Sequence, residues 1–268
     1  LAAVATATPV AGGDRVTIEP EEVPVGGIAV VRVDYTDATG TFGKKPLRFF
    51  RSGAGSMALL GIDLDDPPGL YRVLVSAADG ALGSRELRVV RKTFPVERLT
   101  VPKTYTELDP MTLRRVQREQ RRLDALWSAT GPERYWDGAF VMPAAGPSGS
   151  PFGLRRFFNG EPRSPHAGID IKAPAGTPVH ASNRGRVALA DELFFTGKTV
   201  VLDHGHGLFT LYVHLSEIAV KPDVIVEKGA AVGRVGATGR ATGPHLHFAA
   251  RIGEARVDPQ ALLGRVVD

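Results

Sequence analysis

Short runs of alternating or β-branched residues dominate the first hundred positions. Turn-forming segments such as VPVGG, DATG, DDPPG and AADG separate them, which is typical of a chain folded into successive strands. The runs are RVTI (15–18), IAVVRVDY (28–35), LRFF (47–50), SMALLGI (56–62), LYRVLVSA (70–77) and RELRVVRK (85–92). Their spacing predicts an Ig-like β-sandwich over 14–101, after a flexible segment, 1–13. Its acidic residues lie in turns, so we expect no catalytic residue there.

A helical period interrupts this pattern between residues 110 and 127. Asp109 can cap the helix, and Pro110 suits its first turn. The apolar positions at helical spacing are Leu113, Val116, Leu123, Leu126 and Trp127. The arginines are Arg114, Arg115, Arg118, Arg121 and Arg122. We predict a linker helix, in a segment spanning 102–130, whose basic face either is solvated while the helix docks on both domains or holds an anionic wall polymer.

The remainder of the chain, 131–268, returns to short strands punctuated by glycine. The strand-like runs are GTPVHAS, RGRVALA, KTVVLDH, LFTLYVHL, VGRVGAT and HLHFAAR. They predict antiparallel β-sheets curled around a groove, so the whole chain is expected to be mainly β. The loop 146–163 is long, basic and glycine-rich, and we interpret it as a wall or cover of the groove. Its candidate substrate contacts are Arg155, Arg156 and Asn159, although an ordinary rim loop explains them equally well.

Composition narrows the function classes. The chain of 268 residues is 43% hydrophobic and 23% charged, an ordinary balance for a soluble protein. It has no cysteine, which excludes thiol catalysis, thiolate metal sites and disulfides. Its net charge of +4 suits an anionic polymer, whereas the lack of an aromatic and basic cluster disfavours nucleic acid. We find no apolar run long enough to span a membrane.

Two short motifs carry metal-binding chemistry. His166-x-x-x-Asp170 occurs in SPHAGIDIKAP, and His245-x-His247 occurs in TGPHLHF. Zinc prefers imidazole nitrogen and carboxylate oxygen in tetrahedral geometry, and two His with one Asp leave a fourth position for water. If PHLHFAAR is a strand, His245 and His247 project from the same face, so one can bind the metal while the other stays free beside it.

The other histidines have different contexts. His214 lies in the apolar run LFTLYVHL, where a buried imidazole needs a partner or a task. We interpret it as a second imidazole near the metal-bound water, the alternative being a core histidine bonded to backbone. His204 and His206 lie in DHGHG, which is typical of a hairpin turn. The chain has no Gly-x-Ser-x-Gly elbow, no His-Glu-x-x-His and no nucleotide-binding fingerprint.

Together these motifs resemble the lysostaphin-type (LytM-type) zinc metallopeptidases, which cut peptide bridges in peptidoglycan. The matching segments are His166-x-x-x-Asp170, Tyr212-x-His214-Leu215 and Thr242-Gly-Pro-His245-Leu-His247-Phe, in the family's order, within residues 140 to 255. The resemblance implies one Zn²⁺ per chain, with His166, Asp170 and His247 as ligands and His214 and His245 as catalytic imidazoles. Which imidazole is the general base stays open.

The resemblance also implies the reaction. Zinc lowers the pKa of its bound water and polarises the scissile carbonyl, while a free imidazole transfers the proton to the leaving amine. Some relatives place a tyrosine upstream of the first ligand, and the segment 136–165 has none. Stabilisation of the oxyanion is therefore expected from an imidazole, the zinc or backbone donors.

We therefore expect a monomeric zinc endopeptidase that hydrolyses peptide cross-links in peptidoglycan. The start LAAVATATPVAGG, uncharged and without an initiator Met, predicts a mature end left by an export signal and hence a periplasmic or cell-envelope location. One rival is a non-catalytic wall-binding protein or amidase activator, and the complete set of ligands and imidazoles disfavours it. Another is a zinc peptidase that acts on a protein substrate. The sequence leaves open which cross-link is cut and what the sandwich does.

Overall fold

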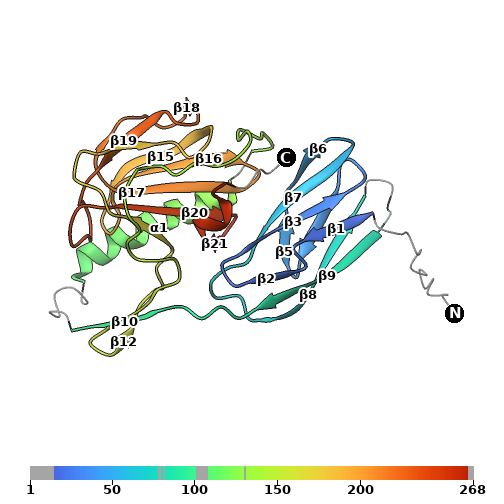
Figure 1. Cartoon of the computed structure of the whole chain (residues 1–268), viewed down its shortest axis with the longest axis horizontal. Coiled ribbons are helices and arrows are strands. Elements are labelled where there is room, and N and C mark those ends of the chain that lie inside the picture. The colour runs from blue at the N-terminus through green and yellow to red at the C-terminus, as the bar shows by residue number, and fades with distance from the viewer. Residues whose placement is uncertain (1–14, 78–79, 81, 101–107, 130, 265–268) are drawn as a thin grey trace.

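The computed structural model describes residues 15–77, 80, 82–100, 108–129 and 131–264, and it is mainly β, as predicted. Two halves lie side by side, the N-terminal one in blue tones and the C-terminal one from yellow to red (Figure 1). The predicted segment 1–13 lies outside the described residues. The four predicted segment boundaries stay predictions.

The N-terminal half consists of two sheets. One has the antiparallel order β1 (Val16–Glu19), β3 (Ile28–Val33), β7 (Gly55–Gly61), β6 (Phe49–Ser52). The other has the order β2 (Glu22–Pro24), β9 (Leu82–Val90), β8 (Gly69–Ser76), β4 (Thr39–Phe42), β5 (Lys45–Leu47), with only the pair β2 and β9 parallel. Alternation places Val16 and Ile18 inside, and they share one core with Val73 and Leu87 of the second sheet. The Ig-like assignment stays a prediction.

A small sheet joins the halves. β10 (Val96–Leu99) follows the sandwich and pairs in parallel with β11 (Arg155–Phe158), which forms a hairpin with β12 (Glu161–Pro162). In Figure 1, β10 extends from the sandwich to the C-terminal half. Part of the predicted loop 146–163 thus forms the two strands β11 and β12, and β11 is tied to the chain that leaves the sandwich.

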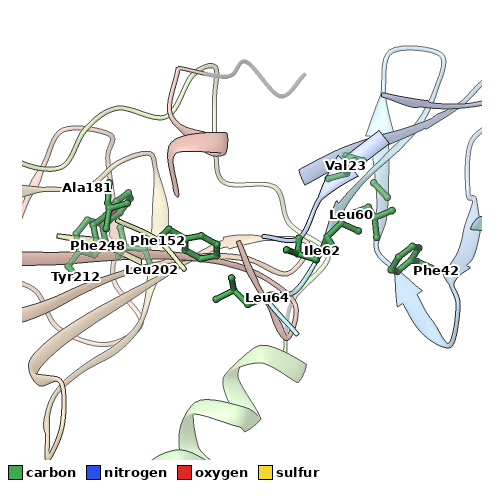
Figure 2. Packing of buried hydrophobic residues seen from close by; sticks show 14 of the residues in the cluster. Val23, Phe42, Leu60, Ile62, Leu64, Phe152, Ala181, Leu202, Tyr212 and Phe248 are labelled. Atoms are coloured by element: carbon green, nitrogen blue, oxygen red, sulfur yellow. The ribbon is translucent and has the colours of Figure 1, made fainter. Parts of the chain in front are cut away.

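The C-terminal half is built on an antiparallel nine-stranded sheet, as predicted. Its main path is β13 (Gly168–Ile171), β20 (Leu246–Ile252), β17 (Leu208–Ile218), β16 (Gly197–Gly205), β15 (Gly185–Leu193), β18 (Ile225–Val226). Off this path lie β14 (Pro178–His180), β19 (Ala231–Val235) and β21 (Ala255–Val257), and the helix α2 (Pro259–Leu262) follows. Tyr212, Phe248 and Leu202 are fully buried on this sheet (Figure 2).

The predicted helix is α1 (Pro110–Ser128), and Asp109 caps it by accepting hydrogen bonds from the backbone N–H groups of Met111 and Thr112. Trp127 is buried against Phe209, with ring centroids 5.1 Å apart. α1 therefore docks on the large sheet. Of the described helices, none has the length and apolar character needed to cross a membrane.

The two halves share their hydrophobic cores. One cluster joins residues of the sandwich to Phe152, Tyr212 and Phe248, and Ile62 and Leu64 lie at the junction (Figure 2). A Cβ on Gly26 would approach the Phe152 ring to 2.4 Å, and one on Gly61 would approach Ile252 to 2.9 Å. These glycines allow side chains of the C-terminal half to pack directly against the backbone of the sandwich.

Candidate active site

Three neighbouring strands position the metal-binding motifs. β13 pairs with β20 so that Asp170 lies opposite His247, and β20 pairs with β17 so that His247 lies opposite Val213. Residues that face each other across antiparallel strands project from the same side of the sheet. His166 lies two residues before β13. Strand register therefore brings together segments that are about eighty residues apart in the sequence.

The predicted ligand atoms converge. His166 Nε2 lies 3.0 Å from Asp170 Oδ1 and 2.8 Å from His247 Nδ1, and His247 Nδ1 lies 3.0 Å from Asp170 Oδ1. In the part of the chain that the structure describes, these three residues form a group of nitrogen and oxygen donors that can hold a metal ion. His166 Nδ1 donates to the Pro151 carbonyl at 2.9 Å, which fixes the ring so that Nε2 faces the cluster.

The charge distribution suits a cation. Burial by itself would raise the pKa of Asp170, but hydrogen bonds from His166 and His247 outweigh it and hold that pKa well below its usual range. Burial lowers the pKa of His247, so its neutral form is favoured. The cluster thus offers a carboxylate together with neutral imidazole, the protonation states that bind zinc.

His214 reaches the cluster through a backbone irregularity. Because it follows Val213, strand alternation would send it to the opposite face, but its φ of 63° and a register shift between β16 and β17 redirect it. Its backbone N–H donates to the Thr196 carbonyl at 3.0 Å, and its Nδ1 donates to the Thr238 carbonyl at 2.8 Å. Burial lowers the pKa of His214 to about 4, so the ring is neutral at pH 7.

His245 completes the arrangement. Its ring centroid lies 4.9 Å from that of His214, and its Nε2 lies 3.7 Å from Asp170 Oδ1. Its Nδ1 donates to the Gly243 carbonyl at 2.8 Å. Two imidazoles with Nδ1 occupied therefore stand beside the donor cluster, each with Nε2 available for proton transfer.

A glycine maintains the approach between the two motifs. A Cβ on Gly168 would meet the Phe248 carbonyl at 2.3 Å and the His247 ring at 2.9 Å. Gly168 lies between His166 and Asp170 in the sequence. Its position inside the metal-binding motif is the feature from which its importance could have been predicted. The carbonyls of Pro151, Thr196 and Thr238, which bind the histidines, could not be predicted in this way, because every residue has a backbone carbonyl.

The predicted substrate contacts are dispersed. Arg155 approaches Asp65 of the sandwich at 4.0 Å, whereas Arg156 binds Glu97 at 3.2 Å and donates to Ser150 Oγ at 3.3 Å. Asn159 is exposed in the turn between β11 and β12, with a φ of 54°. Of the three residues, Arg156 is linked to the cluster through Ser150, because the Ser150 carbonyl accepts from the Asp170 N–H at 3.0 Å. Substrate contact by all three residues stays a prediction.

The remaining aromatic and histidine residues of the motifs are structural. His206 lies in the hairpin turn, as predicted, but His204 lies in β16, fully buried between the Arg184 carbonyl and Thr210 Oγ1, each at 2.8 Å. Tyr212 is also fully buried, and its hydroxyl accepts from the Ser182 N–H at 2.7 Å. Of the Tyr212-x-His214 segment, only the histidine reaches the site.

Comparison with known proteins agrees with this geometry. The model of peptidase family M23 matches residues 164–259. The chain is 43% identical over 110 residues to the DD-carboxypeptidase/endopeptidase Mpg of Neisseria meningitidis serogroup B, covering 41% of this chain and 25% of the relative. It is 45% identical over 85 residues to the peptidoglycan DD-endopeptidase ShyA of Vibrio cholerae, covering 32% of this chain and 20% of the relative. The matched regions thus span a quarter or less of these relatives.

A solved structure covers almost the whole chain. It is the crystal structure of a Pseudomonas aeruginosa protein assigned to peptidase M23, with a TM-score of 0.74, 35% identity, and coverage of 90% of this chain and 95% of that one. The likeness therefore extends well beyond residues 164–259, which the family model matches. The chain belongs to peptidase family M23, as the resemblance of its motifs to the LytM-type metallopeptidases predicts.

Proposed function

We propose that this chain is a zinc-dependent endopeptidase that hydrolyses peptide cross-links in peptidoglycan. The observation that carries the proposal is the pair His214 and His245 beside the cluster of His166, Asp170 and His247. A purely structural metal site uses all of its ligands to close the coordination sphere and needs no further imidazoles. Free imidazoles next to a three-donor site are the arrangement of metal-assisted hydrolysis.

The donor set fits zinc. Two imidazole nitrogens and one carboxylate oxygen are ligands that zinc binds, and they leave room for a fourth. Hydrogen bonding of His166 Nδ1 to the Pro151 carbonyl fixes the ring so that Nε2 faces the other donors. When bound there, zinc would polarise the scissile carbonyl and lower the pKa of water.

The protein's own residues would manage the proton. His214 is held by the Thr238 carbonyl and His245 by the Gly243 carbonyl, so both rings keep fixed orientations during the reaction. One imidazole would accept the proton of the attacking water, and the leaving amine would receive it. A neutral ring whose Nδ1–H is bonded to a carbonyl has no hydrogen on Nε2, so the imidazole that has taken up the proton of the water would be the one that donates from Nε2 to the developing oxyanion.

The substrate class follows from the relatives. Both matched relatives bear names of peptidoglycan or DD-endopeptidases, which supports cross-linked stem peptides as the substrate. Such a substrate places the chain in the cell envelope or periplasm. A monomeric state is part of the same proposal.

The test is turnover of purified peptidoglycan by the full chain. We expect soluble cleavage products, detected by mass spectrometry, which disappear after chelation and return when zinc is added. The matched variant is His180→Ala, because His180 is a half-buried histidine bonded to the Gly229 carbonyl, outside the site. Unchanged turnover in the chelated protein would contradict the proposal.

The same experiment separates the rivals. Binding of peptidoglycan by the zinc-loaded chain without any cleavage would favour a wall-binding protein or amidase activator. Cleavage of an unfolded protein, with none of peptidoglycan, would favour a peptidase that acts on proteins.

A further inference from the structure

A loop beside the catalytic imidazoles presents an arginine. Residues 237–244 connect Gly236 to His245, whose backbones pair at the base of the loop with an N–H to carbonyl distance of 3.1 Å. Within this loop, the Arg240 N–H donates to the Phe195 carbonyl at 2.8 Å, and the guanidinium lies 4.4 Å from the centroid of the Phe195 ring. Thr238, two residues earlier, accepts from His214. Arg240 is therefore fixed at the edge of the site.

Two more arginines approach from the hairpin of β11 and β12. Arg156 donates to Ser150 Oγ, and the Ser150 carbonyl accepts from the Asp170 N–H. The Arg163 N–H donates to the Arg156 carbonyl at 2.9 Å, and its guanidinium lies 5.9 Å from the Phe158 ring centroid. Arg156 thus stands on the side of Asp170 and Arg163 is next to it in the hairpin, whereas Arg240 stands on the side of His214.

The three guanidinium groups influence one another. The pKa of Arg240 is lowered, first by burial and then by the positive charges of Arg156 and Arg163. Glu97 compensates Arg156 at 3.2 Å. In the part of the chain that the structure describes, neither Arg163 nor Arg240 forms an ion pair. The folded protein therefore holds two uncompensated positive charges, one of them in the loop that binds His214, and an anion would stabilise this arrangement.

We propose that Arg240 and Arg163, together with Arg156, form a subsite for a carboxylate of the substrate peptide close to the bond that is cut. The inference rests on the proposed function, and it identifies the part of the cross-linked peptide that the groove recognises. Guanidinium groups bind carboxylates through paired N–H donors in a fixed fork, which gives orientation as well as affinity. Stacking on Phe195 and Phe158 limits the freedom of Arg240 and Arg163 and so reduces the entropy lost on binding.

The experiment uses two cross-linked peptides that differ only in whether the carboxylates next to the scissile bond are free or amidated. For Arg240→Gln we expect kcat/KM on the free acid to fall about tenfold, as loss of one charge-assisted interaction of about 1.5 kcal/mol implies, mainly through KM. Turnover of the amidated peptide should not change. Arg163→Gln, on a different element, should shift the ratio in the same direction.

The control is Arg72→Gln, because Arg72 is exposed on β8 of the sandwich. It should leave both peptides unaffected. An equal loss on the two peptides in Arg240→Gln, or no loss on either, would overturn the subsite.

A binding measurement keeps this inference separate from the proposed function. Calorimetric titration of the metal-free full chain with the same peptides should show about tenfold weaker binding of the free acid to Arg240→Gln than to the wild type, with no difference for the amidated peptide. If the wild type cleaves neither peptide, the endopeptidase proposal fails, while this titration still decides the subsite. Equal affinities of wild type and variant for the free acid would refute it.

Discussion

At the scale of single residues, the site depends on backbone groups that orient each side chain. The carbonyls of Pro151, Thr238 and Gly243 each occupy one ring nitrogen of His166, His214 and His245, respectively. A ring held in this way presents its second nitrogen in a fixed direction, and the proposed function gives that nitrogen a metal-binding role in His166 and a proton-transferring role in His214 and His245. Exchange of a ligand and exchange of a catalytic imidazole should therefore have different consequences.

Loss of a ligand should abolish metal binding. For His166→Ala or Asp170→Ala we expect loss of zinc, measured by elemental analysis of the purified protein, and loss of turnover with it, because two donors hold the ion poorly. His180→Ala should keep both. A ligand variant with stoichiometric zinc and normal turnover would show that the altered residue is no ligand.

Loss of His214 should affect the chemistry alone. His214→Ala should retain zinc and a normal unfolding temperature while turnover falls about a hundredfold or more, since general acid–base catalysis contributes about 10²–10⁴. Zinc content, thermal unfolding and turnover are measured on the same preparation. Zinc loss from a folded variant would mean that His214 is a ligand.

At the scale of elements, α1 uses its arginines in two ways. Arg122 pairs with Asp191 at 2.7 Å, and Arg115 pairs with Glu119 and donates to the Glu192 carbonyl at 3.2 Å. These two arginines therefore dock the helix on β15, which agrees with the interpretation of a docked linker helix. All five arginines of the basic face are exposed, but in the described part of the chain Arg114, Arg118 and Arg121 form no ion pair. Their spacing places them on one side of the helix. These three arginines therefore remain available to bind an anionic wall polymer, which is the other interpretation of the basic face.

We predict that exchange of Arg114, Arg118 and Arg121 for Glu weakens binding to whole peptidoglycan sacculi most at low salt. Exposed charges are screened within about 10 Å at 0.1 M ionic strength, so the difference should shrink as salt rises. Cleavage of a small cross-linked peptide should stay normal. The charge-matched control exchanges the exposed Arg51, Arg72 and Arg91 of the sandwich side. If both triple variants bind sacculi equally well, the prediction is wrong and α1 acts only as a structural linker.

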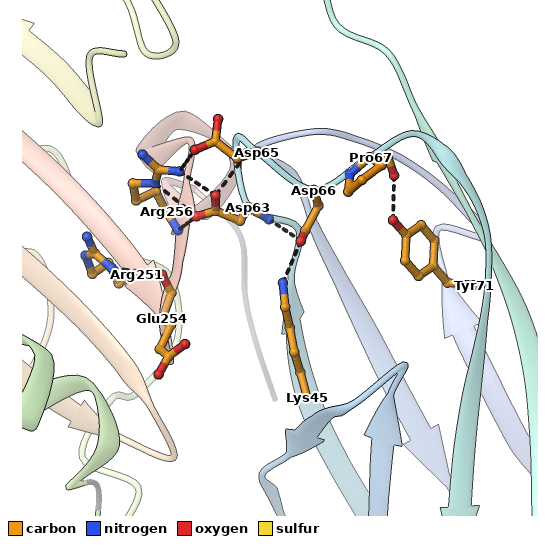
Figure 3. A network of polar contacts seen from close by, with 9 residues as sticks. All are labelled: Lys45, Asp63, Asp65, Asp66, Pro67, Tyr71, Arg251, Glu254 and Arg256. Carbon is orange, nitrogen blue, oxygen red and sulfur yellow. Dashed lines mark hydrogen bonds and ion pairs between the residues drawn. The ribbon is translucent and has the colours of Figure 1, made fainter. Parts of the chain in front are cut away.

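At the scale of the whole molecule, the sandwich and the large sheet behave as one packed unit. Besides the shared cores, Arg256 of β21 binds Asp63 and Asp65 of the sandwich at 2.5 and 2.7 Å (Figure 3). Burial raises the pKa of Asp63, but hydrogen bonds from Arg256 and the backbone outweigh it and lower that pKa to about 2. A flexibly tethered module would not form such a partly buried contact, so the sandwich and the C-terminal half are packed against each other as one unit.

The stability of the protein should therefore fall in acid partly through Asp63. Its pKa is lower in the folded than in the unfolded state, so its contribution is complete above pH 4 and is lost as the pH falls toward 2. A shift of this size corresponds to about 2 kcal/mol. Asp63→Asn should lower the free energy of unfolding by about that amount at pH 7 and by much less at pH 2, measured by denaturant titration. The same difference at both pH values would exclude the ion pair as its origin.

The sequence by itself determined the elements and the chemistry of the site. Alternation of apolar residues marks the strands, Asp109 and Pro110 mark the start of α1, and the motifs around His166 and His247 contain their own glycines. These features are local, since each depends on residues a few positions apart. The donor set could therefore be predicted, as could the two imidazoles, although their ligand and catalytic roles stay predictions until they are measured.

Tertiary structure alone decided which surfaces meet. Arg155 and Arg156 are adjacent in sequence, yet one approaches the sandwich and the other the Ser150 hydroxyl, because β11 sends neighbouring side chains to opposite faces. The positive charges of Arg156 and Arg163 lower the pKa of Arg240, although the β11–β12 hairpin and the 237–244 loop lie far apart in the chain. His214 reaches the site through a register shift, and register depends on the pairing of strands that are distant in the chain. Contacts between distant segments depend on packing of the whole molecule, which no local pattern of residues encodes.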